Sequence, residues 1–154
     1  MTKKLVIAIS ILFLFILTGC ERNKLTEFER LFKVDNPNIH SMTYAELIEL
    51  AESKSGVVFI AKSTESTRKL GQIFCDQLCE CDVNKAHYVN PDDIIDNQLL
   101  TIFNVQQLNY PIIASFKKGE LVGYYDSKTS PEDIEAYLYE LISAAYPTVC
   151  SEAC

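Results

Sequence analysis

The sequence lacks an excess of positive charge, and this absence narrows the partners that the protein can have. Its 154 residues include 14 Lys and Arg against 21 Asp and Glu, for a formal net charge of −7. Nucleic-acid binding requires clustered Lys and Arg that neutralise phosphates, so no nucleic-acid partner is expected. The same shortage argues against a basic patch that would hold the protein on anionic lipid. Internal repeats and low-complexity tracts are also missing, and the length fits one domain.

A membrane-spanning run is missing as well, because the N-terminal apolar segment is too short. Lys3 and Lys4 precede an almost unbroken apolar run from Leu5 to Leu17. This run has about 13 residues, whereas a helix that crosses a bilayer needs roughly 20. A positive start, a short apolar stretch and small residues after it are the three parts of a secretory signal peptide.

The segment ends in Leu17-Thr18-Gly19-Cys20, which resembles the cleavage box of bacterial lipoprotein signal peptides. The resemblance implies cleavage before Cys20, which then carries a diacylglyceryl thioether with acyl chains such as palmitate. Removal of residues 1–19 leaves 12 basic and 21 acidic residues, a net charge of −9. We therefore expect a lipid anchor on the extracytoplasmic face of a bacterial cell membrane. The alternatives are an uncleaved anchor and an ordinary signal peptide with a coincidental cysteine.

Residues 20–38 are polar and charged, and we interpret them as a tether or linker. Leu25, Phe28, Leu31 and Phe32 recur within them at helical spacing. A short amphipathic helix that docks on the domain or lies on the lipid surface is therefore an equal alternative to an unstructured linker.

Strand and helix patterns alternate over residues 39–146, which we assign to one α/β domain. Thr43-x-x-Glu46 is a capping box before a helix. The apolar run Val57–Ala61 is typical of a strand buried on both faces. Asn90-Pro91-Asp92-Asp93 predicts a helix start, and Lys117-Lys118-Gly119-Glu120 predicts a hairpin turn. Further strands are expected at 39–42, 86–89, 112–116 and 121–125, and further helices at 66–79 and 131–145.

The segment Tyr110-Pro-Ile-Ile-Ala-Ser-Phe-Lys-Lys-Gly-Glu-Leu-Val-Gly, followed by a capped last helix, resembles the second half of thioredoxin. It is similar in particular to short Gram-positive lipoproteins and accessory proteins with thioredoxin domains, some linked to bacteriocin export or maturation. The resemblance covers residues from about 39 to 145. It implies a thioredoxin-like fold, with a central mixed sheet flanked by helices. It also implies a cis Tyr110–Pro111 bond, whose backbone edge pairs with extended substrate; the alternative is an ordinary trans proline at a strand start.

The Cys-x-x-Cys motif of that family is missing. In the family it opens the helix after the first buried strand, where the helix N-terminus lowers the pKa of the first thiol. The resemblance assigns these positions to Thr64 and Thr67, whose hydroxyls cannot replace a thiolate in disulfide exchange. Cysteine is absent between Cys20 and Cys75, so no small shift of the alignment restores the motif. The expected groove is instead lined by hydroxyls and the proline loop: Ser63, Thr64, Ser66, Thr67, Tyr110 and Pro111.

Five cysteines remain after Cys20, an odd number in a compartment that permits disulfides: Cys75, Cys79, Cys81, Cys150 and Cys154. In the implied fold, helices 66–79 and 131–145 run the same way on one face of the sheet, so their ends are neighbours. We therefore expect Cys79 or Cys81 to be joined to Cys150 or Cys154, which staples the tail of residues 147–154. A relocated redox pair and a zinc site of three or four thiolates are the alternatives. The staple interpretation involves no metal and no cofactor.

These observations favour a membrane-tethered binding or accessory module without enzymatic activity, which takes an extended peptide or a partner protein. The alternative is a thiol–disulfide oxidoreductase that uses Cys79 and Cys81, or Cys150 and Cys154. His40 and His87 have no partner that the sequence can place, and we expect both to be structural or exposed.

Overall fold

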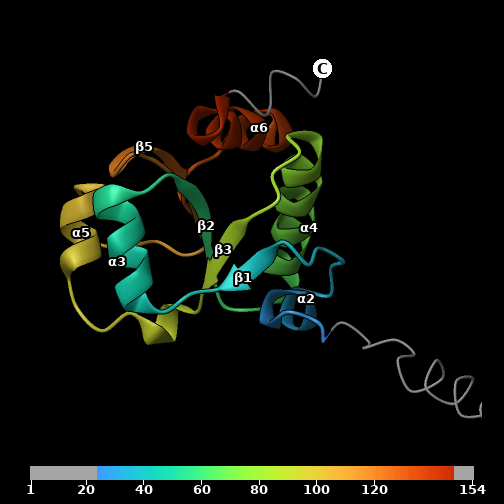
Figure 1. Ribbon diagram of the computed structural model, residues 1–154, viewed down its shortest axis with the longest axis horizontal. Coiled ribbons are helices and arrows are strands. Elements are labelled where there is room, and N and C mark those ends of the chain that lie inside the picture. Colours follow the sequence, from blue (N-terminus) through green and yellow to red (C-terminus); the bar gives the residue numbers. More distant parts are fainter. Residues whose placement is uncertain (1–23, 148–154) are drawn as a thin grey trace, which may run out of the picture.

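The computed structural model describes residues 24–147, which form a five-stranded mixed sheet with helices on both faces (Figure 1). The expected signal peptide, Cys20, Cys150 and Cys154 lie outside the described residues. The strands are β1 (Ile39–Ser41), β2 (Gly56–Ile60), β3 (Ala86–Val89), β4 (Ile112–Lys117) and β5 (Glu120–Tyr125). The helices are α2 (Glu27–Phe32), α3 (Tyr44–Ser53), α4 (Glu65–Glu80), the 3-10 helix η1 (Pro91–Asp93), α5 (Gln98–Phe103) and α6 (Ile134–Ala145). Between residues 24 and 147, no helix is long and apolar enough to cross a membrane.

The sheet has the strand order β1-β3-β2-β4-β5. Strands β1, β3 and β2 are parallel, while β4 is antiparallel to both β2 and β5. The β4–β5 hairpin turns at Lys118 and Gly119, as the sequence predicts. Gly119 has φ +80°, and a Cβ atom there would lie 2.2 Å from the backbone oxygen of Glu52, so only glycine fits. The strand order and directions confirm the predicted thioredoxin-like fold class.

Two apolar cores lie on opposite faces of the sheet, and β2 contributes to both. Successive side chains of a strand point to opposite faces. Val57 and Phe59 therefore enter the core that α2, α4 and α6 cover, whereas Val58 and Ile60 enter the core beneath α3 and α5. Figure 1 shows α3 and α5 on one side of the sheet and α4 on the other. Burial of β2 on both faces explains its unbroken apolar sequence.

Helix α2 belongs to the first of these cores. Phe28 and Phe32 are 0% and 1% exposed and stack on each other with ring centroids 4.4 Å apart. Both rings also meet Phe59 edge-on. Gly71 of α4 leaves room for them, since a Cβ atom there would lie 3.1 Å from Phe32 Cδ1. The sequence left open whether this segment docks or stays a linker. It docks, so the packed domain extends N-terminal to the predicted boundary at residue 39.

The segment after β3 is less helical than its sequence suggests. Asn90 caps the predicted start, since its Oδ1 accepts a hydrogen bond from the N–H of Asp92 at 3.1 Å. Only the single turn η1 follows, and the chain is irregular until α5 begins at Gln98. This irregular segment lies at the carboxyl end of β3 and forms part of the site described next.

Candidate functional site

The carboxyl end of β2 and the amino end of β4 meet at one edge of the sheet. Ile60 pairs with Ile112 in the antiparallel register, which places Pro111 next to the residue that follows β2. The Tyr110–Pro111 bond is cis, as the resemblance implied. Tyr110 and Pro111 are half-buried, and burial raises the pKa of the Tyr110 hydroxyl. The structure thus brings the predicted proline loop to the edge at which α4 begins.

Thr64 and Thr67 cap the amino end of α4. Thr64 is the N-cap residue, and its Oγ1 accepts a hydrogen bond from the N–H of Thr67 at 3.2 Å. Thr67 Oγ1 accepts one from the N–H of Thr64 at 2.8 Å and donates one to the carbonyl oxygen of Lys62 at 2.6 Å. Because Thr67 is buried, its hydroxyl stabilises the turn and is turned away from the surface. Of the two threonines, only Thr64 is exposed.

The two predicted serines differ in the same way. Ser63 Oγ donates a hydrogen bond to the carbonyl oxygen of Leu31 at 2.7 Å, and Arg68 Nε donates to the same oxygen at 3.3 Å. This contact fastens the end of α2 to the start of α4. Ser66 is exposed, and its Oγ lies 3.1 Å from Thr64 Oγ1. The exposed hydroxyls of the predicted groove are therefore those of Thr64 and Ser66.

Contacts among the strand ends fix the shape of this edge. The Tyr88 hydroxyl donates to the carbonyl oxygen of Ala61 at 3.1 Å, which joins β3 to the residue after β2. Burial raises the pKa of Tyr88 to about 12, so this hydroxyl stays a donor at physiological pH. On the surface, Lys62 Nζ and Asp92 Oδ1 form an ion pair at 2.6 Å, with both side chains more than half exposed.

An acidic groove that the sequence did not predict adjoins this edge. Its volume is about 600 Å³, and its lining includes the carboxylates of Glu27, Glu46, Asp92 and Asp93. Ile95, which is 82% exposed, stands at the same groove. The only sequence signal was the Asn-Pro-Asp-Asp segment, which is typical of a helix cap. Glu27 joins the groove through the docking of α2, and no local pattern predicts that.

One wall of the acidic groove is held by a tyrosine–carboxylate hydrogen bond. The Tyr44 hydroxyl at the start of α3 donates to Asp96 Oδ1, which also accepts the N–H of Gln98 at 2.8 Å. Burial, with Asp96 as a further cause, raises the pKa of Tyr44 to about 12. The hydrogen bond from Tyr44 lowers the pKa of Asp96. This contact fixes the irregular segment before α5 against α3.

The described cysteines lie away from this edge, toward the carboxyl end of α4. Cys75 is buried and Cys79 exposed, and both are free thiols. Cys81 is fully buried and disulfide-bonded. Since Cys150 and Cys154 lie outside the described residues, the predicted pairing with the tail stays a prediction. No group of three or more His, Cys, Asp or Glu side chains within residues 24–147 could hold a metal ion.

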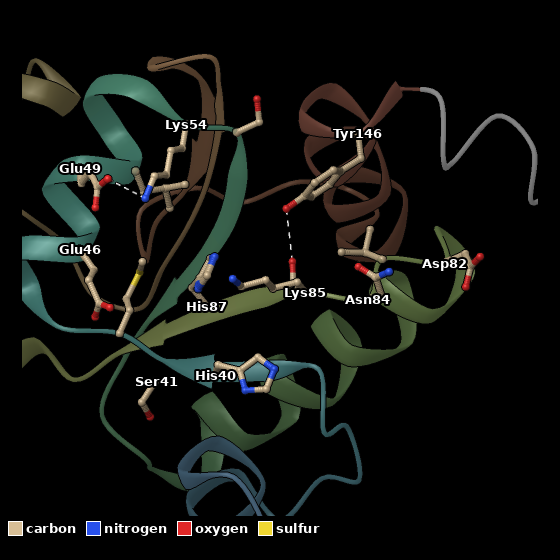
Figure 2. A pocket seen from close by; sticks show the side chains of 14 residues that line it. His40, Ser41, Glu46, Glu49, Lys54, Asp82, Asn84, Lys85, His87 and Tyr146 are labelled. Carbon is tan, nitrogen blue, oxygen red and sulfur yellow. Dashed lines mark hydrogen bonds and ion pairs between the residues drawn. The ribbon is translucent and has the colours of Figure 1, made fainter.

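A larger cavity, of about 810 Å³, lies over the β1–β3 edge (Figure 2). His40 and His87 pair in register on these strands and form part of its wall. Burial, Lys85 and His40 lower the pKa of His87. Two of the carboxylates that line the cavity already have partners, because Glu46 accepts the N–H of Thr43 and Glu49 pairs with Lys54 at 2.7 Å. Both histidines thus stand at a cavity wall, where His87 is half-buried and His40 is exposed. No role in catalysis follows from these positions.

Comparisons with known proteins reach the level of the fold. No protein-family profile and no curated protein matches the chain. Thioredoxin O2 from Arabidopsis thaliana in the oxidized state is similar with 15% identity and a TM-score of 0.49, over 68% of this chain and 95% of that one. A mutant thioredoxin from Halobacterium salinarum gives 16% identity and a TM-score of 0.47, over 73% and 95%.

A third similar structure was described for the thiol resolving mechanism in yeast mitochondrial 1-Cys peroxiredoxin. Its sequence identity is 16% and its TM-score 0.47, over 68% of this chain and 93% of that one. Sequence identities this low are informative about the fold alone and not about the activity. The chain's own strand order and strand directions show a thioredoxin-like fold, and the hydroxyl side chains of Thr64 and Thr67 cap the start of α4.

Proposed function

We propose that this protein is a membrane-tethered, extracytoplasmic binding module with a thioredoxin-like fold and no thiol–disulfide activity at the α4 edge. Lipid on Cys20 would anchor the mature chain. An extended peptide, or an extended segment of a partner protein, would lie along the edge formed by Thr64, Ser66 and the Tyr110–Pro111 loop. The protein would then act as the accessory proteins that it resembles do, some of which are linked to bacteriocin export or maturation.

One observation carries this proposal: the amino end of α4 is closed by reciprocal threonine hydrogen bonds. A thiol–disulfide exchange centre needs a nucleophilic thiolate at this position. Thr64 and Thr67 supply only hydroxyls, and Thr67 is already committed to the carbonyl oxygen of Lys62. The free thiols that the structure describes, Cys75 and Cys79, lie near the other end of the helix. Within residues 24–147, this edge therefore has no thiol for the exchange.

The adjoining acidic groove indicates the chemistry of the partner. Four carboxylates and the exposed Ile95 side chain line this groove, and one of them, that of Asp92, pairs with Lys62 just before the hydroxyls. Such a surface favours Lys and Arg, and among the described residues Lys62 is the cation that pairs with one of these carboxylates, that of Asp92. A basic segment with at least one apolar side chain would fit this surface, whereas an acidic segment would be repelled.

Fluorescence anisotropy with labelled peptides tests this function. We expect an extended peptide of alternating Lys and Leu to bind more tightly than one of alternating Glu and Leu, with an affinity that falls as salt is added. The D92N/D93N double variant should weaken binding of the Lys peptide severalfold. The E132Q variant is the matched control, because Glu132 is also exposed but precedes α6. Equal binding of both peptides, or no effect of D92N/D93N, would contradict the proposal.

The second candidate is an oxidoreductase that uses cysteines elsewhere in the chain. Its supporting observation is the exposed free thiol of Cys79, two residues from the disulfide-bonded Cys81. Three carboxylates, those of Asp76, Glu80 and Asp82, stand at neighbouring positions of the sequence. Reduction of the folded protein with dithiothreitol, followed by reoxidation, separates the two candidate functions. The disulfide of a redox pair is reduced and re-formed readily, whereas a structural disulfide stays in place.

A further inference from the structure

Two free thiols lie one helical turn apart on α4, and the buried side-chain amide of Asn36 lies beside them. Cys75 is 3% exposed and Cys79 is exposed at the surface. Asn36 Nδ2 lies 4.0 Å from Cys79 Sγ, and the Asn36 side chain also hydrogen-bonds the Cys75 sulfur. Asn36 is itself only 3% exposed, and its Oδ1 accepts the N–H of Asn38 at 3.0 Å. That bond holds the amide of Asn36 in place beside the carboxyl-terminal part of α4.

The spacing of the two thiols suits a bridging ion better than a disulfide. Residues four apart on a helix have Cβ atoms about 5–6 Å apart. A disulfide requires a Cβ separation of about 3.5–4.5 Å, so it would force the end of α4 to deform. A metal ion bound to both sulfurs, at about 2.3 Å each as in zinc–thiolate sites, bridges a wider separation than a disulfide does. Within residues 24–147, no third His, Cys, Asp or Glu side chain completes a metal site with these two thiols, so we consider an ion that two thiolates satisfy.

We propose that Cys75 and Cys79 bind one soft monovalent cation of the Cu(I) class through two thiolates. Thiolate ligands select Cu(I) over harder ions, and this ion is satisfied by few ligands. On binding, each thiol gives up its proton, so one ion is taken up and two protons are released. The oxidation states of the metal and of both sulfurs stay unchanged, and the site becomes an anion with a single negative charge.

Asn36 has a defined part in this site, because an amide N–H that donates to a metal-bound thiolate stabilises its negative charge. The negative charges of Asp76 on α4 and Glu29 on α2 act on Cys75 and oppose this stabilisation. Because each thiol must lose its proton to bind the ion, the affinity rises with pH.

A Cu(I) titration against a chromogenic Cu(I) chelator, without oxygen or thiol reductant, tests the site in the full chain purified in detergent. We expect one Cu(I) per chain, with an affinity that rises about a hundredfold from pH 6 to pH 7 because two protons are released. C75S and C79S should each lower the affinity at least a hundredfold. N36A should lower it about tenfold, as expected for a group that only supports the ligands.

The D76N variant gives a readout that a loss of folding cannot imitate. Removal of this negative charge should raise the Cu(I) affinity severalfold, while K69Q, an exposed change on the same helix, should leave it unchanged. Binding that survives in C79S, whose altered side chain is exposed, would overturn the proposal. So would peptide mapping that finds a Cys75–Cys79 disulfide in the purified protein.

Discussion

The hydroxyls of Thr64 and Thr67 each accept a hydrogen bond from the other residue's backbone N–H, at 3.2 Å and 2.8 Å. This reciprocal pair satisfies two of the N–H groups that a helix leaves unpaired at its start. The same two side chains occupy the positions where the resemblance to thioredoxin expects cysteines. Both side chains cap the helix, and neither supplies a thiolate nucleophile.

Wild-type protein should not reduce insulin at any pH from 6 to 9, because no thiolate stands at the start of α4. The T64C/T67C double variant should create this activity, at a stability cost of about 1 kcal/mol for each lost capping hydroxyl. Insulin turbidity measures the activity, and thermal unfolding measures the cost. T64S/T67S keeps the hydroxyls and is the inactive control. A double cysteine variant that remains inert would contradict the assignment of these two positions.

Cys20 should carry the lipid anchor. The mature protein is then expected to partition into the detergent phase of a phase-separation assay, and to incorporate labelled fatty acid. C20S should remain uncleaved and unlabelled, because the thioether needs the cysteine sulfur. Unchanged processing and labelling in C20S would show that the anchor, if any, lies elsewhere.

The staple should join Cys81 to Cys150 or Cys154. The closed loop has about 70 residues, for which chain-entropy estimates give roughly 4 kcal/mol of stabilisation. Reduction should therefore lower the melting temperature and open the tail to proteolysis. Peptide mapping of the non-reduced protein identifies the bond, with C75S as a control that leaves the pattern intact. A Cys150–Cys154 bond beside a free Cys81 would contradict this pairing.

Ser115 is fully buried on β4, and its hydroxyl has no hydrogen-bond partner among the described residues. An unsatisfied buried hydroxyl costs about 1 kcal/mol or more. S115A should therefore increase the free energy of unfolding by about 1 kcal/mol, measured by urea denaturation. S143A on α6 is the control, because its hydroxyl bonds the carbonyl oxygen of Glu140 and is not deeply buried. A clear loss of stability in S115A would reveal a partner for this hydroxyl.

His87 should make the fold less stable in mild acid. Burial first, then the positive charges of Lys85 and His40, lower its pKa in the folded protein. The unfolded chain thus binds a proton more readily, so stability falls as the pH drops below about 6.5, the ordinary histidine value. H87Q should flatten the dependence between pH 7 and pH 5, whereas H40Q, at an exposed position, should change it less. Identical pH profiles for wild type and H87Q would refute this role.

The sequence alone determined those features whose cause is local. The apolar run over 57–61 is explained by a strand buried on both faces. The Thr43-x-x-Glu46 box caps α3 through hydrogen bonds between residues three positions apart. Lys118-Gly119 fixes the hairpin because only glycine tolerates that backbone angle beside Glu52. The absence of cysteine between Cys20 and Cys75 likewise shows, without any structure, that this part of the chain supplies no thiol to the start of α4.

Only the tertiary structure decided what depends on packing between distant segments. The aromatic spacing of Phe28 and Phe32 fits a docked helix as well as a linker or a helix on lipid, until Phe59 and Gly71 provide their pocket. The same docking carries Glu27 to the acidic groove. The meeting of Asn36 with Cys75 and Cys79 likewise joins segments about 40 residues apart. Such contacts follow from the path of the chain around the sheet, which no local pattern records.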